Sequence, residues 1–533
     1  MVVAQEPLAD DVGVAVLKSG GNAVDAAIAV GFALAVTHPV AGNLGGGGFL
    51  LLRQGNGTTA FLDFREAAPA KATRDMYIGP DGNPTRDSLF GWRSAGVPGS
   101  VAGFEAAHKK FGSKPWAELL APAIRLAREG FVVSEPVAAS LRGAESLKAD
   151  PESKRIFLRN GDPYKAGDIF KQPELASTLQ RIADRGAKGF YEGETAGRIA
   201  AAMDAHGGLI TAGDLKNYKV AEREPLAGDY KGFHIITAPP PSAGGVGLLQ
   251  MMKILEGTGY DSAGPDSPKA VHYEAEAMRR FYADRSAYLA DPDFYNVPVK
   301  QLLDPKYVTW RRGTIDATRA TPSELIGPGL PRALDAGIHW KESNQTTHYN
   351  VVDSKGNAVA VTYTLNNSYG NGITVPGLGF LLNDEMDDFV AKPGVANMFG
   401  MVGGDANAIE PGKRPLSSMT PTIVTKDGKL FMVVGAPGGS RITTGVMQVI
   451  LDVLDFHLNV QDAVDLPRFH QQWKPDYLYL QTGFPQSAAA SLREMGYELR
   501  PTDGVARVEA IVVRNGTLEG GTESHLHGRA AGY

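Results

Sequence analysis

The chain has 533 residues, 43% hydrophobic and 21% charged, with a formal net charge of −6. This usage is that of a folded protein and excludes wholesale disorder, and the acidic balance argues against binding to nucleic acid through its phosphates. The longest apolar run, Ala26–Val36, is shorter than the ~20 residues of a membrane span, and the lack of cysteine excludes disulfides, thiolate nucleophiles and cysteine-ligated metals.

Helices are predicted over most of the first half. Apolar residues recur at helical spacing in Ala9–Ser19, and Asn22 then caps a second, almost wholly apolar helix to about Val36, which we expect in the core. Further along, the same patterns predict strands at Phe49–Arg53 and Thr58–Phe64, helices at Pro115–Arg128, Pro173–Arg185 and Pro268–Leu289, and an exposed linker over about Arg312–Lys341.

Beyond this linker the sequence becomes rich in β-formers. The predicted elements are two hairpins, Tyr349–Val352 with Ala358–Thr364 and Thr420–Val424 with Leu430–Val434, and a helix at Ile442–Leu454. Helices before and after paired strands predict sheets that are covered by helices on their outer faces.

The common catalytic and nucleotide-binding motifs are missing. There is no nucleophile elbow, no His-Glu-x-x-His and no P-loop. The run Gly42–Gly48 invites a nucleotide-binding interpretation, but it precedes a strand instead of opening a helix, which favours close backbone packing. His525 and His527 offer a metal-binding alternative to a solvated tail. The motifs therefore predict neither a metal nor a cofactor.

Two threonines are brought together by the register of the first hairpin. If the turn centres on Lys355, opposed residue numbers add to 710, and Thr346 lies opposite Thr364. Directly opposed Cβ atoms are about 4.5–5.5 Å apart, although a register slip of one residue would separate the pair. A threonine becomes a good nucleophile when an N-terminal amine, with a pKa of about 7.7–8.0, acts as its base. Cleavage between Gln345 and Thr346 would release that amine; an ordinary polar loop is the alternative.

A glycine-rich turn follows the second hairpin. The segment Gly435–Ser440 leads into the helix that begins near Arg441, with Ser440 as its expected N-cap. The backbone N–H groups of Gly438 and Gly439, beside a helix N-terminus, suit the oxyanion of acyl transfer. A glycine-rich turn without a ligand is the alternative.

Eight segments spread in order over the chain form a wider pattern. They are GNLGGGGF (42–49), DFRE (63–66), SNQTTHY (343–349), YTLN (363–366), NDEMDDF (383–389), GGDAN (403–407), KRPLSSM (413–419) and GAPGGSR (435–441). This pattern resembles the γ-glutamyltransferase (γ-glutamyltranspeptidase) family of the N-terminal-nucleophile hydrolase superfamily.

The resemblance implies an α/β layered fold, an αββα sandwich of two packed, mostly antiparallel sheets flanked by helices. It implies self-cleavage into a large subunit, 1–345, and a small catalytic subunit, 346–533, which form one intertwined heterodimer. The implied enzyme splits the γ-glutamyl amide of glutathione and other γ-glutamyl compounds through an ester on Thr346. The acyl group passes to water, amino acids or dipeptides, and no cofactor, metal, nucleic acid or membrane span is implied.

The resemblance also assigns roles to individual residues. Thr346 is the nucleophile, Thr364 its hydrogen-bond partner, and the amides of Gly438 and Gly439 the oxyanion hole. The residues assigned to the donor's α-carboxylate are Arg65, Ser417 and Ser418, and those assigned to its α-ammonium are Asn366, Glu385 and Asp388. The residue assigned to the lid over the site is Phe399, within Pro393–Gly412. A forked guanidinium suits a carboxylate, and acidic partners suit an ammonium.

Some positions vary or depart from the family's pattern. Glu385 stands where the family has Gln or Glu, Phe399 where it often has Tyr, and Gly521–His527 lacks the Asp-Pro-Arg-like pattern common there. The N-terminus carries no signal peptide, so a periplasmic or secreted location implies that one was removed before Met1.

Two other functions remain open. A glutaryl-type β-lactam side-chain acylase would use the same nucleophile without an ammonium site, and a binding relative would keep the fold without turnover.

Overall fold

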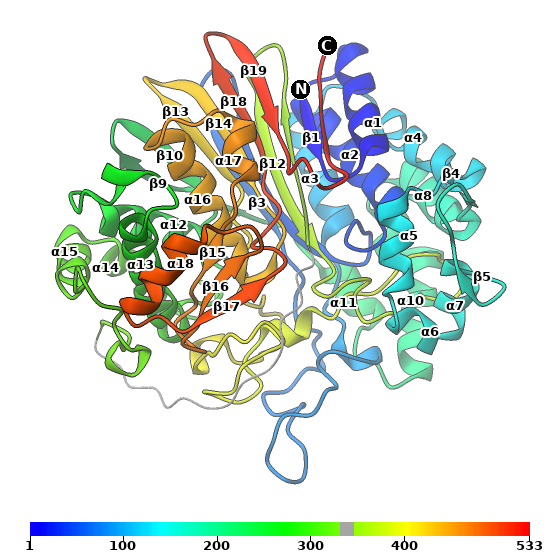
Figure 1. The fold of residues 1–533 in the computed structure, drawn as a ribbon. Helices are drawn as coiled ribbons and strands as arrows, with labels where there is room; N and C mark the ends of the chain where they lie inside the picture. Colours follow the sequence, from blue (N-terminus) through cyan, green and yellow to red (C-terminus); the bar gives the residue numbers. More distant parts are fainter. Residues whose placement is uncertain (331–345) are drawn as a thin grey trace.

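The computed structural model describes residues 1–330 and 346–533. In this part of the chain, two antiparallel sheets form the centre of the molecule (Figure 1). The first has the strand order β20–β1–β11–β12–β2–β3–β8, with β1 at Val2–Ala4, β2 at Gly47–Arg53, β3 at Thr59–Phe64, β8 at Ala221–Arg223, β11 at Thr347–Val352, β12 at Ala358–Thr364 and β20 at Arg529–Ala531. The second has the order β19–β18–β14–β13–β10–β9, with β9 at Leu226–Tyr230, β10 at Phe233–Thr237, β13 at Thr422–Lys426, β14 at Lys429–Gly435, β18 at Glu509–Arg514 and β19 at Thr517–Gly521.

The two sheets pack face to face, and strand β2 shows why. Its side chains alternate between two apolar cores: Leu50 and Leu52 point into one, and Phe49 and Leu51 into the other, beside Val433 of the second sheet. Both faces of this strand are therefore buried, which accounts for its unbroken apolar sequence.

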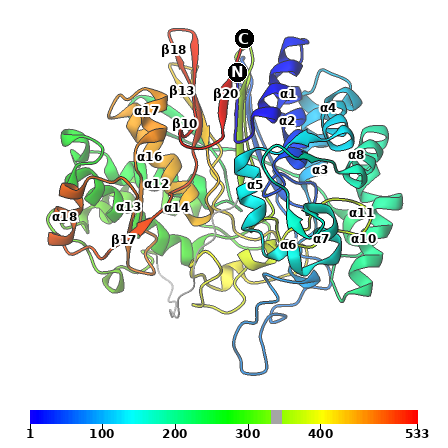
Figure 2. The same ribbon diagram turned by 45° about the vertical axis from the view of Figure 1, so that its right-hand side comes forward.

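Helices cover the outer faces of both sheets, as the turned view makes clear (Figure 2). The core outside the first sheet receives side chains from α1 (Pro7–Lys18), α2 (Ala23–Thr37), α3 (Ser100–Phe111), α4 (Trp116–Glu129), α5 (Glu135–Arg142), α6 (Ser146–Ala149), α7 (Pro151–Phe157), α8 (Pro173–Arg185), α9 (Lys188–Tyr191), α10 (Gly193–Ala205) and α11 (Ala212–Asn217). The other core receives them from α12 (Gly244–Leu255), α13 (Pro268–Tyr288), α14 (Val299–Leu302), α15 (Pro305–Gly313), α16 (Ile442–Leu454), α17 (Val460–Asp465) and α18 (Gln486–Glu494).

The long helices and strands lie within a few residues of their predicted bounds. Helix α2 is buried along its whole length, and the Asn22 side chain accepts hydrogen bonds from the backbone N–H of Val24 and Asp25, each at 2.9 Å. Three smaller sheets complete the described strands. Two have two strands each, β4 (Phe131–Val132) with β7 (Ile169–Phe170) and β5 (Leu158–Arg159) with β6 (Asp162–Pro163); the third has three strands, β15 (Phe469–His470), β16 (Leu478–Gln481) and β17 (Leu499–Thr502). No helix in the described ranges has the length and apolar character needed to cross a bilayer.

The register of the first hairpin is confirmed. Thr347 pairs with Tyr363 and Val352 with Ala358, so opposed numbers add to 710, as the turn predicted. Strand β11 lies between β1 and β12, and β12 between β11 and β2. Strands from before and after the Gln345–Thr346 bond thus interleave in one sheet, with Thr346 directly before β11.

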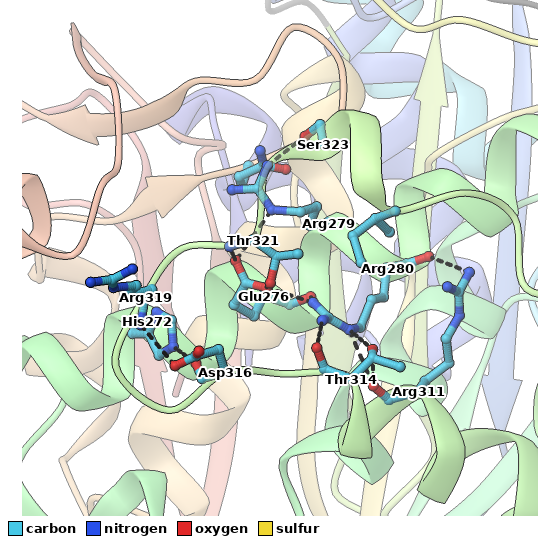
Figure 3. A network of polar contacts seen from close by, with 12 residues as sticks. His272, Glu276, Arg279, Arg280, Arg311, Thr314, Asp316, Arg319, Thr321 and Ser323 are labelled. Carbon is cyan, nitrogen blue, oxygen red and sulfur yellow. Dashed lines mark hydrogen bonds and ion pairs between the residues drawn. The ribbon is translucent and has the colours of Figure 1, made fainter.

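The predicted exposed linker is only partly correct, because residues 314–330 are held against α13 (Figure 3). Thr321 donates from its N–H and its hydroxyl to Glu276, at 3.1 and 2.6 Å, and Ser323 accepts from Arg279. Trp473 donates its indole N–H to the Ser323 carbonyl, at 3.0 Å. Charged α13 side chains and a distant tryptophan hold this segment, and the local composition contains no sign of either. The remainder of the predicted linker, 331–341, lies outside the described residues.

Candidate active site

The two threonines lie side by side. The Thr346 hydroxyl donates to Thr364 Oγ1 at 3.3 Å, and the Asn366 N–H donates to the same oxygen at 2.8 Å. Thr364 is the last residue of β12, so the sheet holds its position, and Asn43 donates to its carbonyl oxygen at 2.9 Å. This is the neighbouring pair of hydroxyls that the hairpin register predicted. Gln345, the other side of the predicted cleavage site, lies outside the described residues.

The glycine run before β2 serves close packing, as expected. A Cβ atom on Gly46 would lie 1.9 Å from the Thr364 carbonyl oxygen, and one on Gly48 would lie 2.3 Å from the Thr362 carbonyl oxygen. Side chains at these positions would push β2 away from β12. The lack of side chains in this run therefore lets β2 lie close to β12, the strand that ends at Thr364.

One small cavity brings most of the predicted site residues together. Its volume is about 20 Å³, space for about one water molecule. A ligand larger than water therefore requires the cavity to widen. The predicted residues that line it are Arg65, Thr346, Thr364, Asn366, Glu385, Asp388, Phe399, Ser417, Ser418 and Gly439; Met401, Met419 and Ile442 line it as well and were not predicted, because nothing in their local sequence distinguishes them from core residues.

Arg65 is the cationic centre of this cavity. It follows β3, is 1% exposed, and forms ion pairs with Glu385, with Asp388 at 2.5 Å and with Glu66 at 3.6 Å. Burial alone would lower the pKa of its guanidinium, but the three carboxyl groups raise it above its usual value. The residues predicted to bind the two ends of a donor therefore contact each other here.

Two of the carboxyl groups around Arg65, those of Glu385 and Glu66, have raised pKa values, and so does that of the nearby residue Asp387. Burial and neighbouring carboxylates raise the pKa of Glu385 well above its usual range, although Arg65 opposes them. Burial raises the pKa of Glu66 to about 7 and that of Asp387 to about 6. The Asp387 carboxylate accepts from Ser88 Oγ at 2.7 Å and from the Met398 N–H at 3.0 Å. Glu66 and Asp387 thus bind a proton closer to neutral pH than an ordinary carboxylate does.

The two predicted serines and Asn366 lie at the cavity wall. Ser417 is buried, and its hydroxyl oxygen accepts from the Met419 N–H at 3.1 Å. Ser418 faces Met401, with 3.9 Å between its Oγ and the sulfur. Asn366 adopts the left-handed conformation, with φ 75°, and donates its amide to the Asp384 carbonyl at 3.0 Å. The positive φ turns the chain sharply directly after Thr364.

The glycine-rich turn lies where it was predicted, but the residue at the N-cap of the following helix is not the predicted one. Gly438 has φ 140° and Gly439 φ 56°, conformations that favour glycine, and a 3-10 turn over Gly439–Arg441 leads into α16. The expected N-cap role of Ser440 is wrong: Arg441 occupies the cap position, and the Ser440 hydroxyl donates to Gln472 Oε1 at 2.9 Å. The 3-10 turn moves the helix start by one residue, and Gln472 lies too far along the chain for a local pattern to reveal it.

The segment Pro393–Gly412, to which the resemblance assigns the lid, contributes Phe399 and Met401 to the cavity wall. Phe399 is 4% exposed and lines the cavity. The Asn397 side-chain oxygen accepts from the N–H of Phe399 at 3.0 Å and of Met401 at 3.3 Å. Asp405–Asn407 forms a 3-10 turn, and Asn407 donates to the Asp388 carbonyl at 2.7 Å. Side chains within and next to the loop hold it in place.

Comparisons with known proteins agree with these observations. The model of the family described as Gamma-glutamyltranspeptidase matches residues 9–533 of this chain. The chain is 48% identical over 538 residues to the glutathione hydrolase proenzyme of Escherichia coli K12, which covers 100% of this chain and 92% of that protein. The structure of the Helicobacter pylori γ-glutamyltranspeptidase gives a TM-score of 0.61 at 44% identity, covering 62% of this chain and 96% of that one. The cephalosporin acylase from Bacillus halodurans gives 0.86 at 28% identity, covering 100% and 95%.

These structural neighbours and the paired antiparallel sheets define the class of protein, the N-terminal-nucleophile hydrolases. Within this class, the chain belongs to the γ-glutamyltranspeptidase family and is an enzyme of that family. The family predicted from the eight sequence segments is confirmed.

Proposed function

We propose that this enzyme transfers and hydrolyses γ-glutamyl groups, with glutathione as one donor and Thr346 as the nucleophile. The observation that carries the proposal is the placement of the Thr346 and Thr364 hydroxyls, 3.3 Å apart, in the wall of a cavity that also holds Arg65 and two carboxyl groups. In this proposal, the hydroxyl nucleophile and the charged groups that recognise a zwitterionic donor line the same small cavity.

The active form in this proposal consists of two chains. The Thr346 hydroxyl attacks the Gln345 carbonyl carbon, the peptide becomes an ester, and water opens that ester. The products are a large subunit, 1–345, and a small subunit, 346–533, which share the first sheet and so form one intertwined unit. The layers correspond in this proposal to the αββα sandwich of N-terminal-nucleophile hydrolases, and the enzyme acts in the periplasm or outside the cell.

Catalysis then follows from the amine that cleavage releases. The α-amino group of Thr346 takes the hydroxyl proton while the oxygen attacks the γ-carbonyl carbon of the donor. The N–H groups of Gly438 and Gly439 stabilise the oxyanion. The leaving amine receives the proton, and water or an acceptor amine attacks the resulting ester, which regenerates the Thr346 hydroxyl.

Recognition of the donor uses both of its charged groups. Arg65, with Ser417 and Ser418, binds the α-carboxylate by forked, charge-assisted hydrogen bonds. Asn366, Glu385 and Asp388 bind the α-ammonium. With both groups held, the γ-carbonyl is the part of the donor that reaches Thr346.

An acylase that removes glutaryl groups is the second candidate, favoured by the structural similarity to a cephalosporin acylase. A glutaryl group lacks the ammonium, so it leaves Arg65 as the cation paired with Glu385 and Asp388 while bringing a carboxylate of its own to the site. Rates on γ-glutamyl and glutaryl anilides, measured on one purified sample, separate the two. We expect kcat/KM to favour the γ-glutamyl anilide at least a hundredfold, because, of the two donors, only this one has an ammonium that offsets the negative charge of these buried carboxyl groups; a preference for the glutaryl anilide would overturn the proposal.

Replacing Glu66 by glutamine should extend activity to lower pH. The ammonium site needs an ionised Glu385, whose raised pKa means that a proton neutralises it as the pH falls. The negative charge of Glu66 contributes to that increase, so removing it lowers the pKa of Glu385. We expect the acidic limb of the pH profile of kcat/KM to move to lower pH. The exposed Glu135→Gln serves as the control; an unchanged limb would remove Glu66 from the electrostatics of the site.

Replacing Phe399 by alanine should loosen donor binding while self-cleavage stays normal. The ring closes the cavity above the glutamyl group, and its loss admits water to the ester. We expect donor KM to rise by about threefold to tenfold and the ratio of hydrolysis to transfer to increase, measured with a γ-glutamyl anilide with and without a dipeptide acceptor. Phe233→Ala, at the start of β10, is the control. Identical partitioning in variant and parent would argue against a lid.

A further inference from the structure

A single buried amide joins the lid to the glycine turn. Gln472 is 4% exposed and lies between β15 and β16. Its Oε1 accepts from the Ser440 hydroxyl at 2.9 Å and lies 2.8 Å from His470 Nε2. Its Nε2 donates to the Phe399 carbonyl oxygen at 3.2 Å. One end of the amide therefore contacts the 3-10 turn that begins at Gly439, and the other contacts the residue that closes the cavity.

The surroundings orient this amide. Because Oε1 can only accept, His470 must present an N–H at Nε2, and burial lowers the pKa of His470 to about 3, which leaves the ring neutral. The other ring nitrogen, Nδ1, lies 2.9 Å from Thr444 Oγ1 in the first turn of α16. Thr444, in the helix after the glycine turn, thus contacts the imidazole, and the imidazole contacts the same end of Gln472 as Ser440 does.

The backbone that carries Gln472 is itself anchored. The next residue, Trp473, donates its indole N–H to the carbonyl oxygens of Ser323 and Ile326, at 3.0 and 2.7 Å. On the other side, the Gln448 amide donates to the Phe469 carbonyl at 2.8 Å. Hydrogen bonds on both sides of Gln472 therefore hold the backbone that carries the amide.

We infer that Gln472 is a positioning residue that couples closure of the lid to the geometry of the oxyanion turn. This inference rests on the proposed function for its catalytic consequence. When the lid is closed, the amide satisfies the Phe399 carbonyl and the Ser440 hydroxyl at once. Moving Phe399 outward breaks one hydrogen bond of an amide whose other end holds the turn next to Gly438 and Gly439. The turn is then best ordered when the donor is enclosed.

Two substitutions at this position separate the two contacts. Gln472→Met has a similar volume and loses both. Gln472→Glu keeps an oxygen that accepts from Ser440, but at about pH 8 its carboxylate repels the Phe399 carbonyl. The exposed Gln486, at the start of α18, gives matched controls for each, Gln486→Met and Gln486→Glu.

Amide hydrogen exchange tests the coupling without any substrate. In Gln472→Met we expect exchange to accelerate about tenfold or more both in residues 397–401 and in residues 439–443, whereas α2, in the other core, keeps its protection. In Gln472→Glu the lid should respond more strongly than the turn. Unchanged exchange in the lid of Gln472→Met, or an equal loss of protection in α2, would overturn the inference.

Kinetics then tests the consequence for the reaction. We expect Gln472→Met to raise donor KM by about threefold to tenfold, to lower kcat as well, and to increase hydrolysis relative to transfer, whereas both Gln486 variants match the parent. If the parent enzyme does not act on γ-glutamyl anilides, the proposed function fails, while hydrogen exchange still decides the coupling. If the exchange changes but kcat and KM do not, Gln472 has a structural role only, and the inference is wrong.

Discussion

Thr346→Ala should yield a single uncut chain of 533 residues with no measurable γ-glutamyl transfer. The substitution removes one oxygen that serves twice, first in cleavage of the Gln345–Thr346 bond and then in attack on the donor. Because nothing else in the proposed mechanism supplies a nucleophile, activity should fall by more than about a thousandfold. A denaturing gel and an intact-mass measurement of the purified protein give the first readout, and release of anilide gives the second.

The adjacent threonine provides a matched control. Thr347 is also buried, and its hydroxyl donates to Gln5 Oε1 at 3.3 Å, away from the Thr364 pair. Thr347→Val keeps the β-branched shape and should still be cut between Gln345 and Thr346, with activity within a few-fold of the parent. A Thr346→Ala protein that still splits at this bond would refute the maturation mechanism.

Arg65→Lys should lower kcat/KM for the donor by about tenfold to a hundredfold although it retains the positive charge. A lysine ammonium cannot present two parallel N–H donors to a carboxylate, and each lost charge-assisted hydrogen bond is worth about 1.5–3 kcal/mol. The structure adds a second reason. Arg65 contacts Glu66, Glu385 and Asp388 at once, and the shorter ammonium would leave part of this buried acidic group unpaired.

The Arg65→Lys substitution should impair reaction with the donor and leave self-cleavage intact. Self-cleavage of Arg65→Lys should proceed, since the maturation step does not use the donor's carboxylate, and the anilide assay at several donor concentrations should show the loss in kcat/KM. Arg142→Lys, in an exposed pair with Glu135, is the matched control and should change nothing measurable. An unchanged kcat/KM in Arg65→Lys would remove Arg65 from the donor site.

Local patterns predicted much of the framework. The run of small and apolar residues after Asn22 gave helix α2 its buried position, and the turn at Lys355 gave the pairing of Thr347 with Tyr363 that brings Thr346 to Thr364. These features depend on residues a few positions apart, on period and on turn geometry, all of which can be counted along a chain. The family pattern rests on motifs of the same local kind.

By itself, the sequence determined the main helices, the two hairpins, the register of the first hairpin and the residue types gathered for the site. Tertiary structure alone decided their partners: Arg65 meets Glu385 and Asp388, Ser440 meets Gln472 instead of capping α16, and residues 314–330 bind to α13 and Trp473. The reason is physical. A buried polar group must find a partner wherever the fold supplies one, and here those partners come from more than thirty to more than three hundred residues away, beyond the reach of any local pattern.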